Sequence, residues 1–226
     1  MIGQLPLPLP VRAALGRAEL VVGACNAEAV AWIDRWPDWP AGVLIVVGPA
    51  GCGKRHLTEV WRARSRAPLL TATALGAVDL PGLSAGGAAA VQVAEPLADE
   101  AVLLHLVNLM REQRGTLLLT ARQAPARWPL ALPDLRSRLL AAHLAQVAEP
   151  DDAMLEALAG KLAADRQLML APGVIEYLIG RGERSYDAVA RVMAALDTRS
   201  LAARRAVTLG LAREVLAGLP GEVPGA

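Results

Sequence analysis

The sequence predicts an α/β protein, a P-loop parallel sheet between helices, followed by a small all-α domain. An uninterrupted apolar run at residues 43–47 has the composition of a strand that is buried on both faces. A glycine-rich loop and a helical pattern follow it, and strand and helix patterns then alternate to about residue 150. Such alternation is typical of a parallel sheet with helical crossovers. Beyond residue 150 only helical patterns remain, so a second, helical domain is expected.

The elements follow in order along the chain. Strands are expected at residues 43–47, 68–72, 89–94 and 116–121. Helices are expected at residues 27–36, 53–64, 99–113, 172–179, 185–196 and 208–216, with one more beginning at Asp151 and Asp152, both N-cap candidates. The predicted domains are an extended arm at 1–12, the α/β domain at 13–149, a helical lid at 150–217 and a disordered tail at 218–226.

Composition and charge exclude several classes of protein. Hydrophobic residues make up 54% of the chain, which favours a packed globular interior. The net charge is +1, from 23 basic and 22 acidic residues, without the basic surplus of a free-standing nucleic-acid binder. Two cysteines outside any CxxC pair predict neither a zinc site nor a disulfide framework. Neither a secretory signal nor an apolar stretch of membrane-spanning length is seen, so a cytoplasmic protein is expected.

A phosphate-binding loop is the strongest motif. Residues 48–54, Gly-Pro-Ala-Gly-Cys-Gly-Lys, fit the pattern GxxxxGK and lie between the best strand and a helix. Glycines let the backbone amides wrap a phosphate, and the lysine reaches the terminal phosphates. A glycine-rich turn that binds nothing stays open as the alternative. The candidate nucleotide-binding residues here are Gly48, Gly51, Cys52, Gly53, Lys54, Arg55 and His56.

The ligands for magnesium are missing from this motif. The complete pattern ends in Ser or Thr, whose hydroxyl binds Mg²⁺, but Arg55 stands there and a guanidinium repels cations. The strand expected to end in a metal-binding Asp is followed by Ala94, with Glu95 one residue later as the substitute. Because hydrolysis needs these parts, we expect a degenerate ATPase with no metal site. ADP is the expected nucleotide, held without magnesium, and ATP binding is left open.

Three segments carry a resemblance to a known family. They are residues 21–23, Val-Val-Gly, with Asn26; the loop 48–57, ending Lys-Arg-His-Leu; and 132–139, Leu-Pro-Asp-Leu-Arg-Ser-Arg-Leu. Together they resemble the bacterial initiator DnaA, an AAA+ protein, and most closely its shorter Hda-type regulatory relatives in their alphaproteobacterial form. The resemblance spans nearly the whole sequence, to about residue 216. Initiators carry a further helix-turn-helix domain for which this sequence has no matching segment.

The resemblance implies roles for matching residues. Val22 and Gly23 would hold the adenine, and Lys54 the phosphates. Arg138 matches the arginine finger that reaches a nucleotide on a neighbouring subunit, and Arg184 matches the sensor arginine of the lid. Without the resemblance, both arginines would be interpreted as solvated side chains on helices.

The N-terminal arm also has a counterpart in the family. Three alternate prolines, at positions 6, 8 and 10, predict an extended segment. A glutamine and leucines along a stiff arm suit docking into an apolar groove at low ordering cost. The resemblance implies that the groove belongs to the β sliding clamp. The candidate partner-binding residues are Gln4, Leu5, Leu7 and Leu9.

The function that the resemblance implies is that of a replication-control adaptor. It would bind the sliding clamp and promote hydrolysis of ATP bound to DnaA, preventing re-initiation, and would meet DNA only through the clamp. Two alternatives stay open. One is an AAA+ ATPase that hydrolyses its own nucleotide, and the other is a DnaA-related nucleotide-binding scaffold without clamp-dependent regulation.

Overall fold

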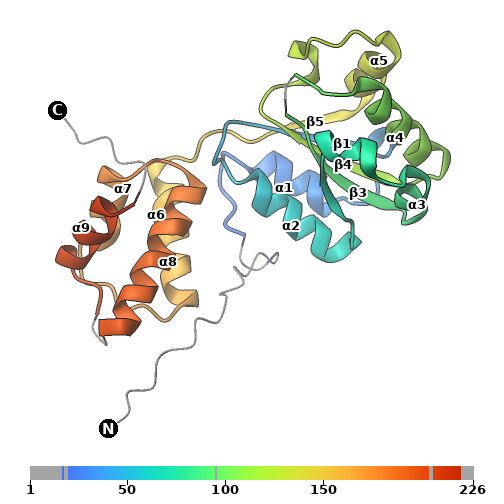
Figure 1. Ribbon diagram of the computed structural model, residues 1–226. Helices are drawn as coiled ribbons and strands as arrows, with labels where there is room; N and C mark the ends of the chain where they lie inside the picture. Colours follow the sequence, from blue (N-terminus) through green and yellow to red (C-terminus); the bar gives the residue numbers. More distant parts are fainter. Residues whose placement is uncertain (1–16, 18–19, 95, 204–205, 220–226) are drawn as a thin grey trace.

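The computed structural model describes residues 17, 20–94, 96–203 and 206–219 (Figure 1). The predicted clamp-binding residues Gln4, Leu5, Leu7 and Leu9 lie outside this described part, and so does Glu95.

A five-stranded sheet forms the centre of the first domain. Its strands run in the order β2-β3-β4-β1-β5, and every pair of neighbours is parallel. The strands are β1 (Val43–Val47), β2 (Leu69–Thr71), β3 (Ala88–Gln92), β4 (Thr116–Ala121) and β5 (His143–Gln146). β1 lies inside the sheet, between β4 and the edge strand β5, so the loop that follows it starts at the carboxyl ends of the strands, one strand in from the edge.

The two faces of β1 explain its uninterrupted apolar run. All five of its residues are buried. Val43, Ile45 and Val47 pack into one apolar cluster, whereas Leu44 and Val46 pack into another on the opposite face. Successive side chains of a strand point to opposite faces, so a strand covered on both sides needs apolar residues at every position.

Helices pack against both faces of the sheet. Helices α1 and α2 lie on one face of the sheet and α3 and α4 on the other (Figure 1). The first domain contains α1 (Ala27–Asp34), α2 (Lys54–Ser65), α3 (Leu80–Ala85), α4 (Glu100–Glu112) and α5 (Pro133–Ala141). Short 3₁₀ segments are η2 (Pro40–Gly42), η3 (Ala72–Ala77) and η4 (Pro125–Arg127).

Four helices form the second domain around a separate apolar cluster. They are α6 (Asp152–Asp165), α7 (Val174–Arg181), α8 (Tyr186–Ala203) and α9 (Leu209–Ala217). Asp151 caps α6, because its carboxylate accepts a hydrogen bond of 2.8 Å from the amide of Met154. Among the described residues, no helix has the length and apolarity that crossing a membrane requires.

Asp151→Ala should lower the free energy of unfolding by about 1 kcal/mol, because it removes the acceptor for an amide in the first turn of α6. Chemical denaturation followed by circular dichroism measures the change. Glu156→Ala, an exposed carboxylate on the same helix, is the matched control. Equal midpoints for the two variants would show that the cap contributes nothing.

The predicted fold class is confirmed, but four elements differ from the expectation. The sequence patterns predicted neither β5 nor α3, and residues 133–141 were recognised only as a motif. β5 is four residues long and fully buries only Ala145, so its apolar pattern is too short to stand out. Helix α8 also continues to residue 203, beyond the predicted end at 196.

Candidate functional site

The phosphate loop connects the end of β1 to the start of α2, and each of its glycines has a steric reason. Gly51 and Gly53 have φ angles of +71° and +101°, a region that residues with a Cβ rarely adopt. A Cβ on Gly48 would lie 2.2 Å from the carbonyl oxygen of Val147. The sequence therefore folds here into the close loop that the GxxxxGK pattern predicts.

The loop contains hydrogen-bond donors suited to a phosphate. No backbone carbonyl of a described residue accepts a hydrogen bond from the amides of residues 50–54, which lie at the N-terminus of α2. The Cys52 thiol is within reach of the Lys54 amide. Lys54 Nζ donates to the carbonyl oxygens of Gly48 and Pro49, at 2.7 and 2.6 Å. The lysine is thus held over the loop, and a phosphate would compete with those two carbonyls for its protons.

The helical domain touches this loop directly at the start of α8. The amide of Tyr186 donates to the carbonyl oxygen of Gly51 at 2.8 Å. A Cβ on Gly51 would lie 2.7 Å from Cβ of Ser185, and one on Gly53 would lie 3.5 Å from the Tyr186 ring. Since this hydrogen bond uses a carbonyl of the loop, it leaves the loop amides available for an anion.

Tyr186 joins the loop to the segment predicted to hold adenine. Its ring is buried, and its hydroxyl lies 3.5 Å from the carbonyl oxygen of Val21. Burial raises the pKa of the Tyr186 phenol to about 12, so it stays protonated at neutral pH. A nucleotide with its base near Val22 and its phosphates in the loop would pass alongside this ring.

Val22 and Gly23 lie at the junction of the two domains. Val22 is 47% exposed and leaves an apolar surface for a base. A Cβ on Gly23 would lie 3.0 Å from the sulfur of Met154 on α6. Asn26 fixes this segment, because its side chain accepts from the amide of Gly23 and donates to the carbonyl of Val21, both at 2.9 Å.

Cys52 packs inside the loop. It is buried, and burial raises the pKa of its thiol although the Lys54 ammonium opposes this effect. The protonated thiol suits a small packing residue better than a nucleophile. The ring of His56 lies 6.2 Å from that of Tyr186 in an edge-to-face arrangement.

Arg55 is exposed at the start of α2, and no hydrogen bond or ion pair links its guanidinium to another described residue. Its guanidinium is therefore available to an incoming anion. The described residues contain no group of three or more His, Cys, Asp or Glu side chains that could hold a metal ion.

Arg184, the predicted sensor arginine, pairs with a carboxylate of its own domain. Its guanidinium lies 2.5 Å from Oδ1 of Asp152 at the start of α6, and both side chains are about half exposed at 56%. The contacts with the phosphate loop come instead from the next two residues along the chain, Ser185 and Tyr186.

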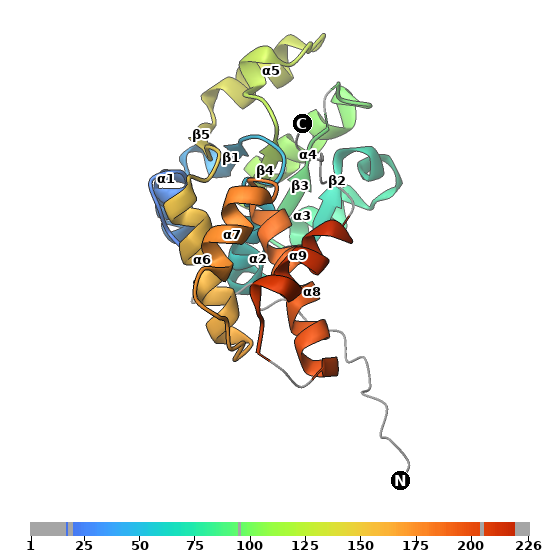
Figure 2. The same ribbon diagram turned by 90° about the vertical axis from the view of Figure 1, so that its left-hand side faces the viewer.

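Arg138 belongs to α5. The helix α5 lies away from the helices of the second domain (Figures 1 and 2). The guanidinium of Arg138 forms an ion pair of 3.1 Å with Asp134, one helical turn earlier. The two side chains are 27% and 57% exposed, so the pair is screened by solvent and weak. The neighbouring Leu135 and Leu139 of α5 are buried in the core.

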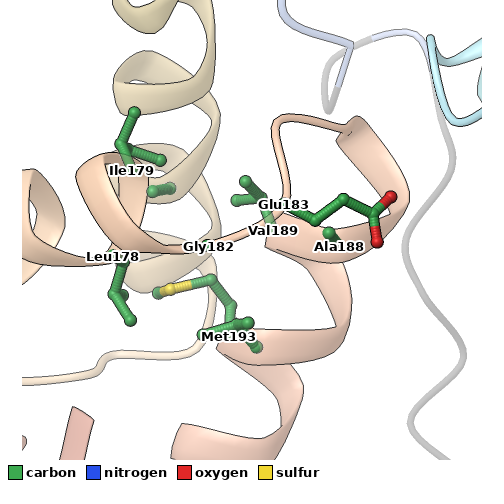
Figure 3. A pocket seen from close by; sticks show the side chains of 9 residues that line it. Leu178, Ile179, Gly182, Glu183, Ala188, Val189 and Met193 are labelled. Atoms are coloured by element: carbon green, nitrogen blue, oxygen red, sulfur yellow. The ribbon is translucent and has the colours of Figure 1, made fainter. Parts of the chain in front are cut away.

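The helical domain also contains a small cavity, of about 20 Å³, between α7 and α8 (Figure 3). Its lining is mostly apolar, and the carboxylate of Glu183 points away from Leu178 and Met193 (Figure 3). That volume has room for about one water molecule. The cavity is therefore too small for a nucleotide and separate from the phosphate loop.

The second domain matches a known family of lid domains. Residues 151–216 match the model of the Hda lid domain. No curated protein matches the chain.

Solved structures share the fold over most of the chain. Domain III of the replication initiation protein DnaA from Thermotoga maritima has a TM-score of 0.75 at 14% identity, over 92% of this chain and 98% of that one. AMPPCP-bound DnaA from Aquifex aeolicus has a TM-score of 0.68 at 13% identity, over 81% and 65%. The Holliday junction branch migration motor RuvB from Thermotoga maritima has a TM-score of 0.55 at 13% identity, over 77% and 60%.

The chain has a DnaA-type AAA+ fold and an Hda-type lid. The resemblance found in the sequence is thereby confirmed for the fold and for the lid. The chain spans 65% of the length of the Aquifex DnaA chain.

Sequence reasoning missed two residues, one beside the phosphate loop and one near the start of α5. Tyr186 follows the predicted sensor arginine, and an aromatic residue at the start of a lid helix was a signal that could have drawn attention to it. Glu100, whose carboxylate is bound near the start of α5, gave no signal beyond a position in the first turn of α4.

Proposed function

We propose that this protein is a replication-control adaptor that binds the β sliding clamp and promotes hydrolysis of ATP bound to the initiator DnaA. The observation that carries the proposal is the placement of Arg138. It lies on a helix remote from the chain's own lid, in a protein whose lid is of the Hda type (Figure 2). A guanidinium so placed serves a nucleotide on another molecule better than one in its own loop.

The environment of Arg138 supports this role. An arginine finger must exchange its resting contacts for phosphate oxygens in the transition state. The solvent-exposed pair with Asp134 is a weak contact of this kind, because exposed ion pairs contribute little to stability. The buried Leu135 and Leu139 hold the helix in place while the guanidinium exchanges partners.

The chain's own phosphate loop has a different task in this proposal. It holds ADP as a structural ligand between the loop, Val22 and Gly23, and the lid. The AMPPCP in the Aquifex DnaA structure supports an adenine nucleotide at a loop of this fold. The missing magnesium ligands argue against hydrolysis of a nucleotide bound here.

A reconstituted assay tests the function. The purified protein, clamp loaded on DNA, and DnaA carrying radiolabelled ATP are mixed, and release of phosphate from DnaA is followed. Hydrolysis that rises only when both this protein and the clamp are present is the expected result. Phosphate release by this protein alone, at the same rate without DnaA, would instead favour the self-hydrolysing ATPase.

The N-terminal arm should carry clamp binding. Replacing Gln4, Leu5 and Leu7 with Ala should abolish capture on immobilised clamp, because it removes the side chains that would fill the apolar groove. The melting temperature should stay unchanged, and Arg12→Ala is the control outside the arm's leucine-proline repeat. Capture equal to that of the unmodified protein would remove the arm from the mechanism.

A further inference from the structure

The start of α5 is anchored by a carboxylate from a different helix. Glu100, the first residue of α4, accepts two backbone hydrogen bonds through its two carboxylate oxygens. The amide of Ala131 donates to Oε1 at 2.9 Å, and the amide of Leu132 donates to Oε2 at 2.8 Å. Both amides lie immediately before α5, 31 and 32 residues away along the chain.

Residues within α5 cannot replace this anchor. Leu132 is the N-cap and has an apolar side chain that offers no acceptor, and Pro133 follows it without an amide hydrogen. A carboxylate at this end of the helix also interacts favourably with the helix dipole. Glu100 therefore acts as a cap supplied from α4, and hydrogen bonds to an ionised acceptor are stronger than those between neutral groups.

The inward face of α5 packs against the core, and the chain enters β5 two residues after the helix ends. Leu135 and Leu139 are buried in the core, and apolar packing is non-directional. It can tolerate a small slide of the helix that two directed hydrogen bonds forbid. Because Arg138 lies between these two leucines, a slide or tilt of α5 would displace its guanidinium.

We infer that Glu100 is a positioning residue for Arg138: its carboxylate fixes the start of α5 so that the guanidinium meets the partner's nucleotide in the productive geometry. This inference rests on the proposed function of Arg138. It requires Glu100 to touch neither nucleotide nor partner, only the two amides that determine where α5 begins.

Glu100→Gln is the deciding variant. Glutamine keeps one acceptor but points an N–H donor at the second amide, so one of the two bonds is lost together with the charge. Misplacement of a catalytic group by about 1 Å can cost on the order of a hundredfold in rate. We expect the maximal rate of stimulated hydrolysis, at saturating protein, to fall about tenfold. The concentration that gives half-maximal stimulation should stay within about twofold, because the surfaces that bind clamp and initiator are unchanged.

This split separates positioning from a loss of folded protein. A variant that merely unfolds has a smaller active fraction, so more of it is needed for half-maximal stimulation while the rate at saturation recovers. Glu112→Gln, an exposed carboxylate in the last turn of the same helix, is the matched control and should behave like the unmodified protein. Glu100→Ala leaves both amides without this acceptor and should lower the maximal rate further.

Three outcomes decide the matter. A fall in the maximal rate for Glu100→Gln alone supports the inference. A maximal rate equal to that of Glu112→Gln, while Arg138→Ala is inactive, overturns the role of Glu100 and leaves the proposed function intact. Full stimulation by Arg138→Ala overturns both.

Discussion

Arg138→Ala should bind the sliding clamp normally and lose the stimulation of DnaA-bound ATP hydrolysis. Arginine fingers contribute about 10³-fold or more to the rate in comparable phosphoryl-transfer systems. Their guanidinium neutralises charge that develops in the transition state, and an alanine supplies nothing in its place. We therefore expect the stimulated rate to fall about 10³-fold, close to the rate of DnaA alone.

The fold should survive this substitution. The guanidinium of Arg138 pairs only with Asp134 among the described residues, and that pair is exposed. Loss of an exposed pair changes stability by less than about 1 kcal/mol. Circular dichroism and clamp capture would therefore match the unmodified protein, so the loss of stimulation could not be attributed to unfolding.

Arg136→Ala is the matched control for Arg138→Ala. Arg136 is exposed on the same helix two residues earlier and carries the same charge. Two positions apart on a helix place the side chains on different faces. If stimulation depended only on positive charge on α5, both variants would lose it to a similar extent. A variant lacking Arg138 that stimulates fully would remove this residue from the mechanism.

Lysine is the second informative replacement. Arg138→Lys keeps the charge but replaces a planar fork of donors with a single ammonium, so bidentate contact with phosphate oxygens is lost. Activity between that of alanine and arginine would show that both charge and geometry contribute.

The parts of the fold that the sequence predicted best are those buried on two faces. β1 and β4 were predicted with the bounds that the structure gives, because every residue of each is buried and the apolar run is continuous. β5 is an edge strand of four residues, and the burial of its side chains alternates. Its short pattern resembles a loop, so local composition gave no basis for predicting it.

Contacts between segments far apart in the chain could not be predicted from local sequence patterns. The loop glycines were found because the motif is contiguous, and the positive φ angles of Gly51 and Gly53 agree with the reason for glycine there. The hydrogen bond between Tyr186 and Gly51 joins positions 135 residues apart, and the local sequence around neither residue predicts it. Arg184 was selected by its motif, yet its pairing with Asp152 depends on how α6 and α8 pack.

ADP should bind the phosphate loop, and removal of magnesium should leave its affinity unchanged. No backbone carbonyl of a described residue accepts from the loop amides, and Arg55 stands exposed where a metal-binding hydroxyl is usual. A guanidinium can pair directly with a β-phosphate and so replace the missing cation. Calorimetric titration with ADP, first in Mg²⁺ and then in excess EDTA, should give the same dissociation constant.

Lys54→Ala should weaken ADP binding about a hundredfold. The lysine now donates to the carbonyls of Gly48 and Pro49, and a phosphate would accept those protons in their place. Loss of hydrogen bonds to a charged group costs about 2.7 kcal/mol here, which corresponds to about a hundredfold in the dissociation constant. Lys161→Ala, in the lid and paired with Asp165, is the control for removal of a lysine.

Arg55→Thr tests directly whether the guanidinium takes the place of magnesium. Threonine restores the hydroxyl that ligates Mg²⁺ in the complete motif and removes the substituted cation. ADP should then bind more weakly in EDTA than in Mg²⁺, whereas the unmodified protein should not distinguish the two buffers. Loss of binding by the unmodified protein in EDTA would show that the guanidinium does not replace the metal. Binding in neither buffer would show that the loop no longer binds nucleotide. The proposed adaptor function would be unaffected, because Arg138 acts on a nucleotide held by another molecule.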